Sequence, residues 1–181
     1  MKINLKTCTE EALWKYVATH LKVKGIDTVL VGGAVVSIYS DGAYKSGDLD
    51  FVLTSMFVKG LPEAMSEIGF VRGSGRHYIH PDCKHLHIEF PSSFLEIGED
   101  NKIEPMEVKS DNVLIKILSP TDCVKDRLAS YIHFNARECL DQAVLVAQKH
   151  PVKIEAVKQW CKNEGAEMAF EDFLKKIKKS N

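Results

Sequence analysis

The chain has 181 residues, of which 45% are hydrophobic and 27% are charged, and its formal net charge is −1 at pH 7. This composition is typical of an ordinary globular protein, and the balance of charge argues neither for nor against a nucleic-acid partner. The length predicts one domain, or one domain with a helical extension, that buries about 70% of its unfolded surface without disulfide staples.

Five cysteines are scattered along the chain and form no C-x-x-C pair. This pattern suits a reducing compartment rather than a disulfide framework. No stretch approaches the ~18 apolar residues of a membrane-spanning helix, and the N-terminus lacks the apolar segment of a signal peptide. We therefore expect a cytoplasmic protein with no membrane partner.

Apolar periodicity predicts alternating helices and strands up to about residue 118. The first helix is expected to begin after an N-cap at Thr9 and to end near Gly25, with Leu13, Val17 and Leu21 as its buried stripe. Two shorter helices are expected at 34–39 and 62–68. The expected strands are 28–31, 49–53, 70–72, 77–79, 86–90, 106–108 and 113–118.

From Ser119 onward the spacing of apolar residues is helical, and Pro151 separates two longer helices from two shorter ones. The predicted fold is therefore α/β (α+β), with a mixed sheet flanked by helices. Residues 1–118 would form this core, and residues 119–181 would form a C-terminal helical segment packed on it.

Two aspartates mark the start of strand 49–53. Residues two apart in a strand point to the same face, so Asp48 and Asp50 would project together about 7 Å apart. Carboxylates this close repel each other unless a cation lies between them. Mg²⁺ takes oxygen ligands of this kind together with substrate phosphates, so the D-x-D spacing predicts a magnesium site.

Glu89 is the best candidate for a third carboxylate, because it lies on the polar face of strand 86–90 directly before Pro91. Three carboxylates can hold the two metal ions that assist in-line displacement at phosphorus. Gly32 and Gly33 stand at the turn between strand 28–31 and the next helix, where backbone N–H groups can approach an anion.

Each of these features is weak alone, since glycine pairs are common in turns and acids are common on solvated strand faces. Their order along the chain carries the prediction: an apolar strand, Gly-Gly, a helix, a D-x-D strand and a later glutamate. That order indicates a phosphoryl-transfer site.

The same arrangement resembles the nucleotidyltransferase superfamily that includes DNA polymerase beta and the minimal nucleotidyltransferases. The resemblance covers residues 28–147, and the later part is similar to the helical part of the abortive-infection-toxin-like branch. The residues that carry it are 29–31, Gly32-Gly33, Asp48-Leu49-Asp50, Glu89, Ser119-Pro120-Thr121-Asp122, Lys125, Asp126, Arg127, Arg137 and Asp141.

The resemblance implies transfer of a nucleoside monophosphate from a nucleoside triphosphate to a hydroxyl group, with Mg²⁺ as cofactor. It implies that Asp48 and Asp50 bind both metal ions, and that Glu89 binds one and helps to activate the hydroxyl. The implied triphosphate ligands are Gly32 and Gly33, with Ser37, Lys45, Ser46, Lys125 and Arg127 as further candidates. Many members have a serine directly after the glycine, where this chain has Ala34.

Four histidines and a cysteine crowd into residues 77–87: His77, His80, Cys83, His85 and His87. Such ligands could bind Zn²⁺, although their spacing matches no familiar zinc finger. Strand alternation places His85 and His87 on the face of Glu89, which favours a wall of the active site. Partly exposed histidines without a role are the alternative.

Two other functions stay open. The first is a catalytically inactive relative that serves as a binding or regulatory module, which Ala34 favours. The second is a zinc-binding protein that uses the histidine cluster. For an active enzyme the acceptor could be a small molecule, an RNA end or a protein side chain, and the resemblance implies a toxin with a cognate antitoxin as one setting.

Overall fold

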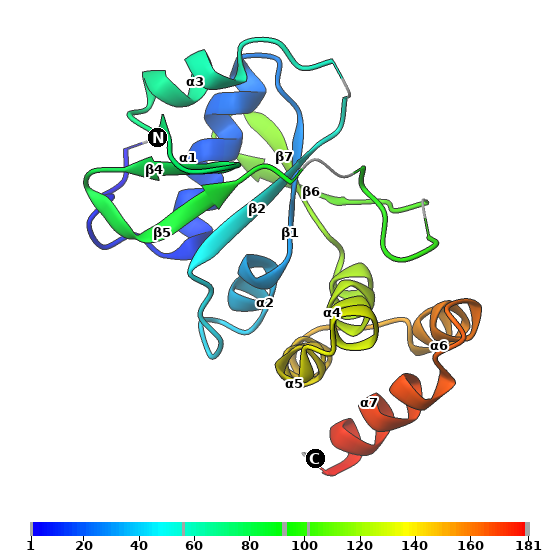
Figure 1. Ribbon diagram of the computed structural model, residues 1–181. Helices are drawn as coiled ribbons and strands as arrows, with labels where there is room; N and C mark the ends of the chain where they lie inside the picture. Colours follow the sequence, from blue (N-terminus) through cyan, green and yellow to red (C-terminus); the bar gives the residue numbers. More distant parts are fainter. Residues whose placement is uncertain (1, 56, 92–93, 101, 180–181) are drawn as a thin grey trace.

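A single mixed sheet with the strand order β3-β4-β5-β2-β1-β7-β6 organises the first part of the chain (Figure 1). The computed structural model describes residues 2–55, 57–91, 94–100 and 102–179. The strands are β1 (Thr28–Val31), β2 (Asp48–Leu53), β3 (Val71–Arg72), β4 (His77–His80), β5 (Cys83–Glu89), β6 (Met106–Ser110) and β7 (Val113–Ile117).

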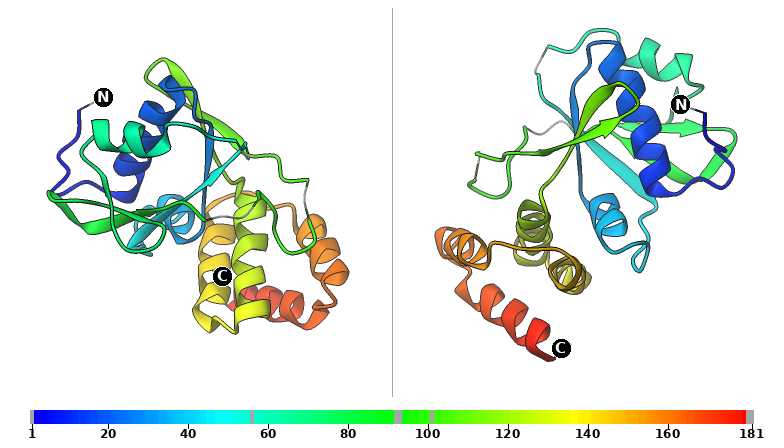
Figure 2. Two further views of the ribbon diagram at one scale, coloured as in Figure 1. Left: turned by 45° about the horizontal axis from the view of Figure 1, so that its top comes forward. Right: turned by 180° about the vertical axis from the view of Figure 1, so that it is seen from behind.

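Helices cover the sheet and then continue beyond it. The helices are α1 (Glu10–Val23), α2 (Gly33–Tyr39), α3 (Leu61–Glu67), α4 (Pro120–Phe134), α5 (Arg137–Lys149), α6 (Ile154–Asn163) and α7 (Glu167–Lys179). Helices α1 and α3 lie on the same face of the sheet, and α4 to α7 gather beside α2 at one end of it (Figure 2). The predicted fold class, a mixed sheet flanked by helices with a helical C-terminal segment, is confirmed.

The strands of the sheet form where apolar and polar residues alternate in the sequence or where the residues are continuously apolar. In β1, Val29 and Leu30 are fully buried, as expected for a central strand covered on both faces. In β2, Leu49 and Phe51 are fully buried and the two aspartates point to the opposite face. The strands therefore bury one set of side chains and present the other at the candidate site.

The central strands pair in a register that decides which acids meet. Strand β2 runs antiparallel to β1, with Val31 opposite Asp50, and parallel to β5. In the parallel pair Asp48 lies opposite His87 and Asp50 lies opposite Glu89. This register brings the third carboxylate, distant in the sequence, beside the first two.

The first helix has the boundaries and the face that its sequence predicts. The Thr9 hydroxyl accepts a hydrogen bond from the backbone N–H of Ala12 and so caps the helix. The stripe of Leu13, Val17 and Leu21 is fully buried against the sheet. Elsewhere the expected elements are present, but β5 begins three residues earlier than expected, at Cys83 rather than Leu86.

Two buried hydrogen bonds tie helices to distant backbone. The Tyr39 hydroxyl at the end of α2 donates to the carbonyl of Leu118 at 2.6 Å, where the chain leaves β7 for α4. The Trp160 indole N–H on α6 donates to the carbonyl of Ile97 at 2.9 Å. Among the residues that the structure describes, no helix combines the length and apolarity needed to cross a membrane.

We expect Tyr39→Phe to reduce the free energy of unfolding by about 1–3 kcal/mol, because it leaves the buried Leu118 carbonyl without this donor. Urea unfolding followed by circular dichroism measures the change. Tyr16→Phe, at a half-buried tyrosine on α1, is the control for removal of a hydroxyl alone. Equal stability of the Tyr39 variant and the wild-type protein would contradict this role.

Candidate active site

Three carboxylates from two strands meet at the end of the sheet that faces the helical segment. One oxygen from each of Asp48, Asp50 and Glu89 lies within 4.8 Å of the others, and all three side chains are half-buried. Like charges this close in a partly desolvated site repel each other strongly, and a divalent cation between them removes that cost. The geometry that the D-x-D motif and the later glutamate predicted is therefore present.

Gly32 provides the space in which the Asp50 carboxylate lies. A Cβ atom at this position would lie 2.5 Å from Oδ2 of Asp50, which is closer than real contacts allow. Its φ of +74° also lies in the left-handed region that favours glycine. At Gly33 a Cβ atom would lie 2.9 Å from the Ser46 hydroxyl. Because neither glycine has a Cβ atom, the backbone turn can lie close to the side chains of Asp50 and Ser46.

The electrostatics of the cluster concentrate on Asp50. Burial, and then the charges of Asp48 and Glu89, raise the pKa of Asp50 to about 7. Arg127 acts in the opposite direction and Asp126 adds to the increase. A pKa raised by burial and by neighbouring carboxylates is typical of functional sites, and a bound cation would lower it.

Asp48 is oriented by a chain of two hydrogen bonds through Ser46, which the sequence did not reveal. The Ser46 hydroxyl donates to Oδ1 of Asp48 at 3.1 Å, and the Ser46 backbone N–H donates to the carboxylate of Glu10 at 3.0 Å. Glu10 is 7% exposed at the start of α1. In the sequence it looked like an ordinary first-turn acid, because nothing near it in the chain marks its contact with residue 46.

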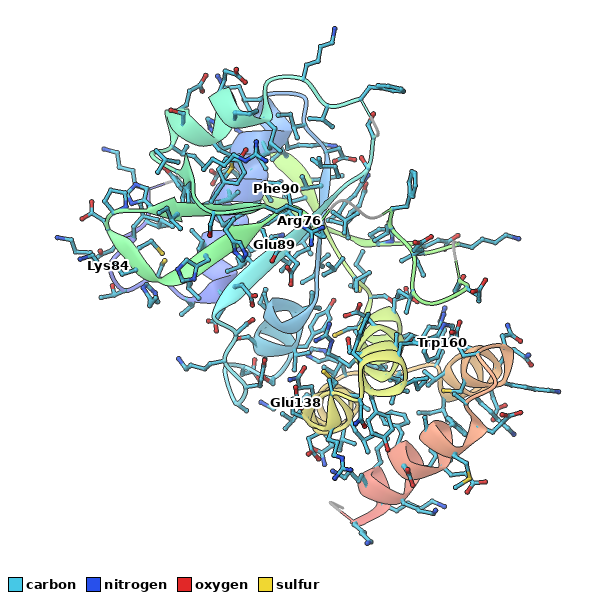
Figure 3. The ribbon with its side chains drawn as sticks, viewed as in Figure 1. Arg76, Lys84, Glu89, Phe90, Glu138 and Trp160 are labelled. Atoms are coloured by element: carbon cyan, nitrogen blue, oxygen red, sulfur yellow. The ribbon has the colours of Figure 1, made fainter. Side chains whose placement is uncertain are left out.

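Glu89 has an arginine and a histidine from the β3–β4 hairpin as neighbours. Arg76 Nε lies 3.4 Å from one carboxylate oxygen of Glu89, and His77 Nε2 lies 3.9 Å from the other. Figure 3 shows Arg76 and Glu89 next to each other at the centre of the molecule. Arg76 was also missed in the sequence, and the only available signal was its place just before a strand paired with β5.

The helical segment contributes Arg127. Its guanidinium donates two hydrogen bonds to the Asp126 carboxylate, at 2.6 and 3.0 Å, and one to Gln142 at 3.4 Å. Its charge lowers the pKa values of Asp50 and Tyr44, although burial raises both. Arg127 therefore lies close enough to affect the electrostatics of Asp50, and its role as a phosphate ligand stays a prediction.

The remaining predicted ligands lie in different surroundings. Lys45 is exposed in the loop before β2, whereas Ser37 is 3% exposed inside α2. Lys125 Nζ pairs with Asp100 at 3.1 Å and with Asp122 at 3.2 Å. Ala34, which directly follows the glycine pair, is fully buried in the core.

The histidines of residues 77–87 do not converge on one point. His77 lies near Glu89, and the ring of His80 packs 5.1 Å from that of Phe70. His85 Nε2 forms a hydrogen bond with the backbone carbonyl of Cys8. His87 lies opposite Asp48 in the pairing of β5 with β2. The cluster is therefore divided between the rim of the acid site and the far end of β5.

Comparison with known proteins supports the fold. No family model matches the sequence, and no curated protein matches it. An antigenic nucleotidyltransferase-like protein from Paracoccidioides brasiliensis is similar in structure, with a TM-score of 0.60 and 14% identity over 93% of each chain. The antibiotic-resistance factor ANT(2'')-Ia has a TM-score of 0.56 and 10% identity over 94% of this chain and 95% of its own. The predicted nucleotidyltransferase-like fold is thus confirmed.

Gly32→Ala tests the contact between the turn and Asp50. If the acid site binds a divalent ion, we expect the substitution to weaken Mn²⁺ binding at least about tenfold, since the new methyl group must displace Oδ2 of Asp50. Isothermal titration calorimetry measures the affinity. Gly42→Ala is a matched control, because its φ of +75° gives the same backbone strain while its surroundings are open. Equal effects of the two substitutions would refute the contact.

Asp50→Asn tests whether the ionised Asp50 carboxylate, half-buried beside Asp48 and Glu89, destabilises the folded protein. Because the pKa of Asp50 is raised from 3.8 to about 7, its ionisation destabilises the folded state as the pH increases through this range. The metal-free variant should therefore be more stable than the wild-type protein at pH 8, by about 1–3 kcal/mol, and the difference should shrink towards pH 4. Thermal unfolding at several pH values measures it.

The control for this experiment is Asp41→Asn. The hydrogen bond from Lys149 lowers the pKa of Asp41, so removal of this carboxylate should decrease stability above pH 4 rather than increase it. A stabilising effect of both substitutions at pH 8 would indicate a general charge effect and would contradict the role given to Asp50.

Proposed function

We propose that this protein is a Mg²⁺-dependent nucleotidyltransferase that transfers a nucleoside monophosphate from a nucleoside triphosphate to a hydroxyl acceptor. The observation that carries the proposal is the convergence of Asp48, Asp50 and Glu89 beside the Gly32 turn. The nucleotidyltransferase-like fold, which the chain shares with the two solved structures, agrees with this kind of reaction.

The donor set fits Mg²⁺. All three groups are carboxylates, the oxygen ligands that this ion prefers, and substrate phosphates would complete the coordination. When bound, the metal would neutralise charge on the triphosphate and lower the pKa of the attacking hydroxyl. In the proposed assignment Asp48 and Asp50 bind both ions and Glu89 binds one.

The chain's own residues would position the substrates. The turn at Gly32 and Gly33 lies directly against the acid site, and its backbone N–H groups are the proposed ligands of the triphosphate. Ser46 would keep Asp48 in its orientation through their hydrogen bond. Glu89, beside Asp50 in the parallel pair, would accept the proton of the acceptor hydroxyl.

Arg127 is the proposed cationic clamp on the phosphates. Its charge already acts on Asp50, and an arginine fork can bind a phosphate oxygen pair as the reaction proceeds. Lys125 is less suited as a phosphate ligand, because its ammonium group already pairs with two carboxylates. It lines a hollow of about 410 Å³ together with Trp160 and Glu164. Lys45, which is exposed in the loop before β2, is a further proposed ligand of the phosphates.

An inactive binding module is the second candidate, and Ala34 is the observation that favours it. The buried position of Ala34 weakens this argument, since a residue there has no access to a phosphate. The acceptor proposed for the active enzyme is a small molecule, an RNA end or a protein side chain. A cognate antitoxin and a cytoplasmic location are carried over from the sequence as part of the proposal.

Incubation with each α-labelled nucleoside triphosphate, Mg²⁺ and a fractionated cell lysate tests the proposal. We expect label on an acceptor in one fraction, and at least about a hundredfold less with Asp50→Asn, because a metal ligand is lost. Glu63→Gln, at an exposed carboxylate on α3, should retain wild-type activity. Nucleotide binding that persists without metal, together with no transfer, would support the inactive module instead.

A further inference from the structure

A second group of metal-ligating side chains lies away from the acid site, where the N-terminal segment meets strand β5. It consists of Cys8, Cys83 and His85, and we call it the thiol–imidazole cluster. One ligand atom from each residue lies within 4.8 Å of the others. Cys8 precedes helix α1, whereas Cys83 and His85 begin β5, so only the fold brings the three together.

The distance between the two sulfur atoms matches that between two ligands of one metal ion. Cys8 Sγ and Cys83 Sγ are 3.9 Å apart. Two thiolates on a tetrahedral Zn²⁺ with Zn–S bonds of about 2.3 Å are separated by about 3.8 Å. The pair therefore needs almost no movement to bind the ion, whereas a disulfide requires an approach to about 2.05 Å.

The imidazole of His85 makes the backbone contact that metal-binding histidines usually make. His85 Nε2 lies 2.9 Å from the backbone carbonyl of Cys8, and because a carbonyl only accepts, this nitrogen carries the proton. The lone pair is then on Nδ1. Metal-binding histidines usually donate their other N–H to a carbonyl or carboxylate in this way, which fixes the ring and its tautomer.

The surroundings combine a protected and an open side. Cys83 is 1% exposed, Cys8 is half-buried and His85 is exposed. A hollow of about 520 Å³, lined by Lys6, Pro81, Asp82, Lys84 and His85, adjoins the cluster. Solvent can therefore reach a metal ion at this place and supply a fourth ligand.

We propose that Cys8, Cys83 and His85 form a Zn²⁺ site, with water as the fourth ligand, that fastens the N-terminal segment to strand β5. Binding would release both thiol protons to solvent, because thiolates are the ligands. The Cys8 thiol, which lies 3.6 Å from the Leu5 carbonyl, would exchange this weak contact for a metal bond. This site stands on its own residues and does not depend on the proposed nucleotidyltransferase activity.

The site also connects to the acid cluster through the start of α1. Cys8 is two residues before Glu10, whose carboxylate accepts the Ser46 N–H, and Ser46 in turn donates to Asp48. Zinc would limit the movement of this segment and thereby help to hold Glu10 in place. An effect of zinc on catalysis through Glu10 rests on the proposed function, whereas the zinc site itself does not.

Cobalt titration of the reduced, metal-free, full-length protein tests the site. Co²⁺ bound by thiolates gives an intense charge-transfer absorption in the near ultraviolet, which carboxylate ligands do not give. We expect this band to saturate at one ion per chain and to decrease when Zn²⁺ is added. Cys8→Ser and His85→Ala should each weaken Zn²⁺ binding at least about tenfold.

Two matched controls separate this site from the rest of the protein. His87→Ala removes an exposed histidine of the same strand and should leave the band unchanged. Asp50→Asn should also retain the band, so failure of the zinc site and failure of the catalytic proposal are distinguishable. No thiolate band in the wild-type protein, or a band that survives in folded Cys8→Ser, would overturn the proposal.

Discussion

The mutual repulsion of three half-buried carboxylates is the constraint around which this protein is arranged. Parallel pairing of β2 with β5 fixes Asp50 beside Glu89, and the two-residue period of β2 adds Asp48 on the same face. The chain supplies cations nearby, but Asp50 still has a pKa of about 7. Such a cluster costs the folded state stability, and a cation bound between the carboxylates would remove that cost.

The elements around the three carboxylates restrict the movement of these side chains more than they neutralise their negative charge. Gly32 leaves room for the Asp50 carboxylate, and the path from Glu10 through Ser46 holds Asp48. Arg76 reaches Glu89 from the neighbouring hairpin. These contacts come from a helix, a loop and a hairpin, so preorganisation of the site depends on the packing of the whole sheet domain.

The helical segment adds a cationic side to the site and a structural connection to the sheet. Arg127 acts on Asp50 from α4, while Tyr39 joins α2 to the backbone at the start of α4. The likeness to the two solved structures extends over the helical segment as well as the sheet, since it covers more than nine tenths of this chain. The helices are therefore part of the shared architecture.

The sequence by itself determined the elements and the three acids, because strand and helix periodicity are local and the D-x-D pair lies on one strand. Glu89 was found for the same reason, from its place on an alternating strand before Pro91. The roles of Glu10, Arg76 and Cys8 were decided only by the tertiary structure. Each contacts a residue from another element, and the strand register and helix packing that bring them together leave no local pattern in the chain.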